Sequence, residues 1–144
     1  MCRARKLYRP RSKRRLARAV AEAICVALGV KTLTLAVTAF TLSWVHSVEK
    51  TGWQEDWALE NGRLRIVEAR IKGSGAGMEP PDGAILRDGW WHYAPGLPPQ
   101  KQIKLAASGA TASGWTLCAS GSCRELGSGA GEAITISVCP QPDD

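Results

Sequence analysis

The residues best suited to chemistry begin with His46, which lies in the stretch FTLSWVHSVEKTGWQED. If residues 40–48 form a strand, His46 lies on its apolar face, and Glu55 shares a face with the tryptophans of a returning strand. An imidazole and a carboxylate would then meet across a hairpin, with Glu49 in the turn between them. Such a pair can transfer protons or bind a cation, and its two members can also simply hydrogen-bond to each other in the core. His46, Glu49 and Glu55 are therefore the candidates for catalysis, with a structural role as the alternative.

The segment from residue 73 to residue 83, GSGAGMEPPDG, is the candidate for ligand binding. Successive backbone amides in a glycine-rich loop can form a concave nest for an anion. The glycine spacing does not match a dinucleotide-binding fingerprint, because no helix follows and no crossover unit surrounds it. The alternative is a purely structural crossing. The expected ligand is a small anionic solute, and the candidate residues are Gly73, Ser74, Gly75, Gly77, Met78 and Glu79.

A third candidate is the aromatic run that precedes His92. Adjacent tryptophans on a strand point to opposite faces, so one of Trp90 and Trp91 is expected in the core and the other at the surface. An exposed aromatic ring suits a partner surface or a flat ligand, and Trp91 is the candidate for that role. The alternative is a strand edge covered by the following APGLPP connector.

The cysteines indicate a hairpin closed by a disulfide. If Ser120 and Gly121 are the two central residues of a turn, Cys118 lies opposite Cys123 in a non-hydrogen-bonded pair, within disulfide reach. No second cysteine pair or local histidine accompanies them, so no metal site is expected. No nucleophile or phosphate-binding motif occurs either, and no cofactor is expected.

The elements that would position these residues are short strands. Period-two alternation begins at Phe40, and the tight-turn pairs Asn61-Gly62 and Asp88-Gly89 punctuate the chain. A change of apolar face near Ile66 and Val67 predicts a β-bulge. About eight or nine strands and no helix are expected after the N-terminal segment. The predicted fold is an all-β antiparallel sandwich or barrel over residues 40–144.

Residues 1–39 form a basic and then apolar segment. It has the layout of a secretory signal or a weak membrane anchor, with Val37 and Ala39 as the small residues before a cut at Phe40. Glu22 and Lys31 interrupt the apolar part, and a cytosolic amphipathic helix is the alternative. Removal of this segment would also remove Cys2 and Cys25. The remaining odd number of cysteines would permit at most one internal disulfide.

The charge is concentrated at the N-terminus. Residues 1–18 hold nine of the 19 basic residues, which leaves 10 basic against 13 acidic residues in the rest of the chain. A nucleic-acid-binding protein usually follows such a tail with a basic fold, so this distribution does not favour nucleic acid as a partner. Contact with a membrane is expected only through the N-terminal segment.

Several long motifs, FTLSWVHSVEKTGWQEDW, RIVEARIKGSGAGMEPPDG, the WW pair and the spacing of WTLC and the next cysteine, resemble a bacterial family. The chain is similar in these motifs to the domain of unknown function 1850, from Phe40 to Cys139. The resemblance implies an association with permeases of the tripartite ATP-independent periplasmic (TRAP) type, and it supplies no catalytic residues.

Together these features predict a small periplasmic β domain, exported or N-terminally anchored. Its expected role is a non-enzymatic accessory that binds a TRAP-type permease, its solute-binding protein or the solute. One alternative is a periplasmic enzyme that uses His46 with Glu49 or Glu55. The other is a cytosolic protein whose basic tail binds nucleic acid.

Overall fold

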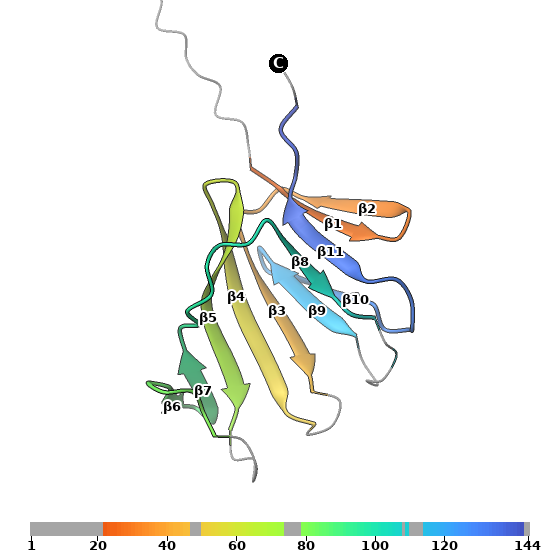
Figure 1. Ribbon diagram of the computed structural model, residues 1–144. Coiled ribbons are helices and arrows are strands. Elements are labelled where there is room, and N and C mark those ends of the chain that lie inside the picture. Colours follow the sequence, from red (N-terminus) through yellow and green to blue (C-terminus); the bar gives the residue numbers. More distant parts are fainter. Residues whose placement is uncertain (1–21, 47–49, 74–78, 108, 110–113, 143–144) are drawn as a thin grey trace, which may run out of the picture.

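The computed structural model describes residues 22–46, 50–73, 79–107, 109 and 114–142. These residues contain eleven strands and no helix (Figure 1). The strands are β1 Ile24–Leu28, β2 Lys31–Leu35, β3 Ala39–Val45, β4 Gly52–Glu60, β5 Arg63–Lys72, β6 Ile85–Arg87, β7 Trp90–Tyr93, β8 Gln102–Leu105, β9 Trp115–Ala119, β10 Ser122–Leu126 and β11 Ile134–Val138. The prediction of an all-β protein is confirmed.

The strands form two antiparallel sheets that pack face to face. The smaller sheet has the order β2-β1-β11-β8, and the larger has the order β10-β9-β3-β4-β5-β7-β6. Neither sheet closes on itself, so the fold is a sandwich and not a barrel. Figure 1 shows the smaller sheet over one end of the larger, whose strands β3, β4, β5 and β7 continue beyond it. One face of the larger sheet is therefore covered in part, and none of the described strands forms a second layer on the opposite face.

The core lies between the sheets and is apolar on both sides. Ile24, Val26 and Ile136 of the smaller sheet are fully buried, as are Leu42 and Leu64 of the larger. Period-two alternation places these residues on the inner faces, while their neighbours point outward. The face of the larger sheet that carries Leu42 is its inner face, and the opposite one is its outer face.

The hairpin turns and the β-bulge that the sequence predicted are present. Asn61-Gly62, Asp88-Gly89 and Ser120-Gly121 all have positive φ at both residues, as the turn of a two-residue hairpin requires. The pairing of β4 with β5 shifts register between Asp56 and Trp57, whose partners are Glu68 and Ile66. Val67 is thus the extra residue of the predicted bulge, and its side chain is exposed.

The N-terminal part of the sheet departs from the sequence prediction. The expected eight or nine strands correspond to β3 to β11, but β1 and β2 come from the segment that was interpreted as a signal or anchor. β1 pairs with β11, and Cys25 forms a disulfide with Cys139. The full chain thus forms two disulfides, whereas the expectation of at most one applied to a chain that begins at Phe40; the sheet brings together two cysteines 114 positions apart.

Candidate binding sites

The inner face of the larger sheet carries three tryptophans in register. Trp44 pairs with Trp53, Trp53 with Ile71, and Ile71 with Trp91, so the four side chains form one row across β3, β4, β5 and β7. We call these four residues the tryptophan row. The rings of Trp44 and Trp53 stack with their centroids 5.9 Å apart. The row is apolar but offers polar N–H edges.

One of those edges has no partner. The indole Nε1 of Trp53 is buried and makes no hydrogen bond within the part of the chain that the structure describes. Trp57 and Trp115 differ, since their Nε1 atoms donate to the Glu55 carboxylate and to the Ala106 carbonyl, each at 2.9 Å. A buried donor without an acceptor is costly, and it marks a place where a ligand oxygen would be stabilising.

Glu55 lies in the next row of the same face. Leu42, Glu55, Ala69 and Tyr93 are aligned there, and Leu42 and Ala69 are buried. Burial raises the pKa of the Glu55 carboxyl, against the opposing effect of the hydrogen bond from Trp57. Burial and the nearby Glu55 charge also raise the pKa of Tyr93. The carboxyl group is held in an apolar setting by one indole donor.

His46 and Glu55 are not neighbours in the sheet. Leu42 is the residue opposite Glu55, and His46 lies four residues further along the chain. At roughly 3.3 Å per residue this is about 13 Å. The imidazole of His46 instead approaches Trp53, with ring centroids 6.4 Å apart. The expected meeting of His46 and Glu55 across the hairpin is therefore not formed, and Glu49 lies outside the described residues.

The glycine-rich segment meets the tryptophan row at its first residue. A Cβ atom on Gly73 would lie 2.6 Å from the Trp91 ring, so only glycine fits where β5 ends. The sequence candidates Gly73 and Trp91 are thus in contact, and Trp91 is half-buried on the inner face. Glu79 is exposed, and the remaining candidates, Ser74, Gly75, Gly77 and Met78, lie outside the described residues.

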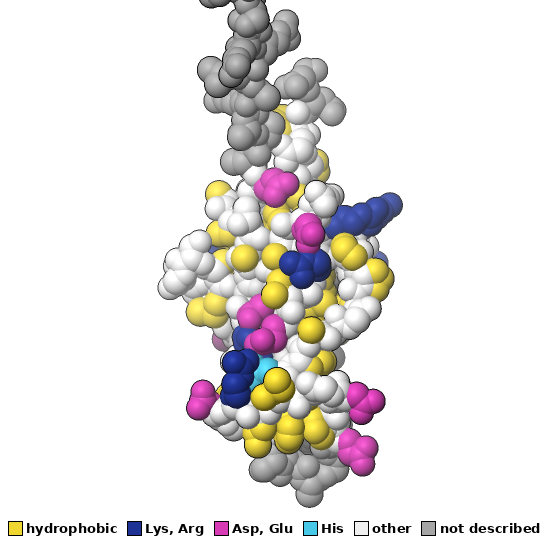
Figure 2. Space-filling view, turned by 90° about the vertical axis from the view of Figure 1, so that its left-hand side faces the viewer, with side chains coloured by type: hydrophobic (Ala, Val, Ile, Leu, Met, Phe, Trp, Pro, Cys, Tyr) yellow, Lys and Arg dark blue, Asp and Glu magenta, His cyan; other side chains and the backbone are white. Residues whose placement is uncertain are grey.

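The outer face of the larger sheet carries a charged cluster. The Arg70 guanidinium donates to both carboxylate oxygens of Asp56, at 2.5 and 2.9 Å, and to Glu68 at 2.9 Å. His92 Nδ1 lies 2.8 Å from the same Glu68 oxygen, and Thr41 donates to Asp56 at 2.7 Å. Figure 2 shows acidic, basic and histidine side chains next to one another on the side of the molecule that carries β6 and β7.

The electrostatics of this cluster follow from its hydrogen bonds. Those from Arg70 lower the pKa of Asp56, and those from His92 and Arg70 lower the pKa of Glu68. Both carboxylates in turn hold the pKa of Arg70 above its already high value. The sequence predicted an imidazole–carboxylate pair of His46 with Glu55, whereas the structure forms one between His92 and Glu68. The alternation of side chains along β5 and β7 could have predicted this contact, because it places Glu68 and His92 on the same polar face.

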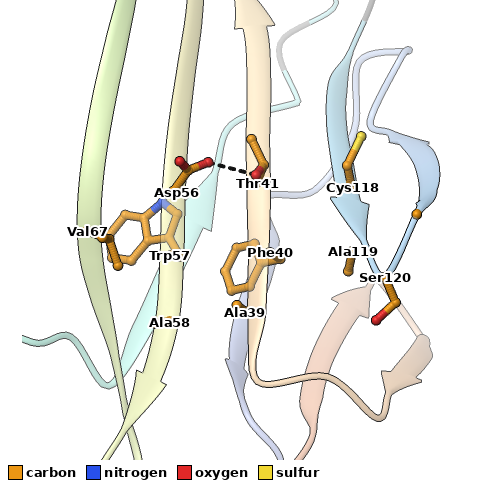
Figure 3. A pocket seen from close by; sticks show the side chains of 11 residues that line it. Ala39, Phe40, Thr41, Asp56, Trp57, Ala58, Val67, Cys118, Ala119 and Ser120 are labelled. Carbon is orange, nitrogen blue, oxygen red and sulfur yellow. Dashed lines mark hydrogen bonds between the residues drawn. The ribbon is translucent and has the colours of Figure 1, made fainter. Parts of the chain in front are cut away.

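A shallow groove of about 440 Å³ adjoins the cluster on the outer face. Figure 3 shows Thr41 and Asp56 joined by their hydrogen bond beside Ala39, Ala58 and Val67. The turn of the hairpin formed by β9 and β10, at Ser120 and Gly121, borders the other side. The lining of the groove is mostly apolar, and its Thr41 and Asp56 side chains already have partners.

The predicted cysteine hairpin is confirmed. Cys118 pairs with Cys123 in the register of β9 and β10, and the two form a disulfide with Cα atoms 4.0 Å apart. Among the described residues no group of three or more histidine, cysteine or acidic side chains could hold a metal ion. The described part of the chain also lacks a helix long and apolar enough to cross a membrane.

Comparison with known proteins gives a family and no function. No curated protein and no solved structure matches the chain. A family model described as "Domain of unknown function (DUF1850)" matches residues 40–126, which run from β3 to the end of β10 and exceed half of the chain. The matched region holds the entire larger sheet, with the tryptophan row and the charged cluster. The chain therefore belongs to the DUF1850 family.

Proposed function

We propose that this protein is an exported, non-enzymatic accessory of a TRAP-type transport system that binds a small solute of that system. Three features support the proposal. Two disulfides are compatible with an oxidising compartment. The chain after residue 18 is slightly acidic, unlike a nucleic-acid-binding fold. The motifs shared with the DUF1850 family carry the implied link to TRAP permeases.

The tryptophan row is the proposed solute site. The observation that carries this is the buried Nε1 of Trp53, which lacks an acceptor among the described residues. A carboxylate oxygen of a small anionic solute would accept that hydrogen bond, while the flat rings of Trp44 and Trp53 would cover its apolar part. Gly73, where the glycine-rich segment leaves β5, lies against Trp91 at the end of the same row.

Removal of the indole N–H of Trp53 tests this site. Trp53→Phe keeps a ring in the row but removes the unpaired N–H. We expect the variant to fold normally and to bind small organic acids at least about tenfold more weakly in calorimetric titrations. The matched control is Trp57→Phe, which removes an N–H that donates to Glu55. It should cost stability and leave solute binding unchanged. Equal binding by wild type and Trp53→Phe would contradict the proposed site.

The transport role has its own test. The tagged protein, purified from membranes, should retain a TRAP permease or solute-binding protein, and deletion of its gene should reduce uptake of the transported solute. Recovery of no transport component, together with unchanged uptake, would refute the accessory role. Solute binding in calorimetry would still stand in that case, so the two parts of the proposal fail separately.

The enzyme alternative rests on different residues from those first considered. Glu68 and His92 form the imidazole–carboxylate contact of the described chain, whereas the register separates His46 from Glu55. The oxygen of Glu68 that contacts His92 also accepts from Arg70, as part of a larger ionic cluster. This arrangement fits a structural role, and we favour binding over catalysis. The nucleic-acid alternative concerns residues 1–18, which lie outside the described residues.

A further inference from the structure

The outer face of the larger sheet holds a second row of aligned side chains, all of them polar. Thr116 pairs with Ser43, Ser43 with Gln54, Gln54 with Arg70, and Arg70 with His92. We call these five residues the polar row. It crosses β9, β3, β4, β5 and β7 on the outer face, which no other strand of the described chain covers.

Two residues of this row have their hydrogen-bonding groups occupied, and the other three have groups without a partner in the part of the chain that the structure describes. Arg70 and His92 belong to the charged cluster, and Arg70 Nε also donates to Gln54 Oε1 at 3.0 Å. The hydroxyls of Ser43 and Thr116 and the Nε2 of Gln54 make no hydrogen bond that involves the described residues. These three groups offer donors and acceptors on adjacent strands.

A hollow of about 210 Å³ lies over these three groups. Ser43, Gln54 and Thr116 line it, together with the ring of Trp90. Trp90 reaches from β7 to β4, because its ring edge would be only 3.2 Å from a Cβ atom on Gly52. The absence of a side chain at Gly52 therefore lets an aromatic wall stand beside three polar groups.

The chemistry of this hollow selects a class of ligand. None of its lining residues is charged, and the nearby Lys72 ammonium is engaged with the Trp90 ring, 5.1 Å from the ring centroid, which favours a neutral ligand over an ion. Its volume lies below the roughly 300 Å³ at which pockets for drug-sized molecules begin, so it suits a single ring. Two hydroxyls and an amide match a ligand rich in hydroxyl groups, and an indole face packs against the C–H face of such a ring.

We propose that this hollow is a saccharide-binding subsite, in which Trp90 stacks on a neutral sugar ring while Ser43, Gln54 and Thr116 bind its hydroxyl groups. Ser43, Gln54 and Thr116 point to the opposite face of the sheet from the tryptophan row, although Trp44 and Trp53 of that row also border the hollow. The ring can belong to a free monosaccharide or to a polysaccharide at the cell surface, because both present the same hydroxyl pattern.

Nuclear magnetic resonance locates such binding directly. The indole N–H signal of Trp90 is identified by its loss in Trp90→Phe, and the side-chain amide of Gln54 gives a second signal in the hollow. We expect both signals to shift when glucose, galactose or mannose is titrated into the millimolar range. Benzoate, which has a flat ring but no hydroxyl groups, should not shift them. A parallel titration with dextran separates the two sources, since tighter binding per ring indicates a polysaccharide.

Two variants test the roles of the wall and the floor. Ser43→Ala with Thr116→Ala removes both hydroxyls with little change of shape and should weaken sugar binding at least about tenfold. Trp90→Phe should retain part of the affinity, and Trp90→Ala should lose it. Circular dichroism checks that each variant is folded. The proposal is overturned if no sugar shifts either signal, or if the double alanine variant binds as well as wild type.

Discussion

Removal of residues 1–39 should unfold this domain. A chain that begins at Phe40 lacks β1 and β2, and with them Ile24 and Val26, which are fully buried in the core. Burial of two such side chains contributes about 3–6 kcal/mol. The truncated chain also lacks the disulfide from Cys25 to Cys139, whose loop of over a hundred residues is worth about 5 kcal/mol. The combined loss is comparable to the roughly 5–15 kcal/mol by which small domains are stable.

The assay compares two chains that differ only in this segment. A chain that begins at Glu22 keeps both strands and should unfold cooperatively in urea, as followed by tryptophan fluorescence and circular dichroism. The chain that begins at Phe40 should show no cooperative transition. The double variant Cys25→Ser, Cys139→Ser separates the two contributions, since it removes the disulfide and keeps the strands. It should remain folded with a lower unfolding midpoint.

The same reasoning constrains processing. If a leader is cleaved on export, the cut must lie before β1, so the mature protein should retain Cys25. N-terminal sequencing and non-reducing mass spectrometry of protein purified from its native cell check this. A stable, folded protein that begins at Phe40 would refute the argument that β1 and β2 are required.

Three further predictions follow from individual contacts. Arg70→Ala should lower the free energy of unfolding in urea by about 2 kcal/mol, less than the roughly 3–5 kcal/mol of a fully buried ion pair, because Asp56 is partly exposed. The control is Arg65→Ala, which should lower it by less than about 1 kcal/mol because Arg65 and its partner Glu60 are both exposed. Glu55→Gln should raise the melting temperature at pH 7 and leave it unchanged below pH 4. The folded state raises the pKa of Glu55 above its usual 4.5, so the wild type loses stability as the pH rises from 4.5 towards the folded pKa. Glutamine does not ionise, so the variant avoids this loss. A difference in melting temperature between variant and wild type that does not change with pH would contradict this. Gly73→Ala should destabilise by about 1–3 kcal/mol, since its Cβ would meet the Trp91 ring, whereas Gly96→Ala, with nothing within 4 Å, should have little effect on thermal unfolding.

The sequence by itself determined the local geometry of most of the sheet. Alternation identified which side chains share a face, and the pairs Asn61-Gly62 and Asp88-Gly89 marked the turns, because few other residues adopt positive φ there. The bulge at Val67 and the disulfide between Cys118 and Cys123 were also predictable. Each of these features depends on residues within one strand or one hairpin.

The candidate sites were less accessible from the sequence. The tryptophan row and the polar row each combine several strands, and alternation alone does not say which residues lie opposite one another. The pairing of Leu42 with Glu55 separated His46 from its expected partner, and the pairing of β5 with β7 joined His92 to Glu68. These contacts depend on register, which turns and bulges set only for strands that follow each other directly.

The strand structure of residues 24–35 could be seen only in the tertiary structure. Their apolar composition fits a signal segment as well as it fits buried strands, because both require a run of apolar residues. In the folded chain these residues form β1 and β2, because β11 pairs with β1 from the far end of the chain and brings Cys139 to Cys25. A pairing between residues more than a hundred positions apart leaves no local pattern in the sequence, and it is this pairing that completes the second sheet.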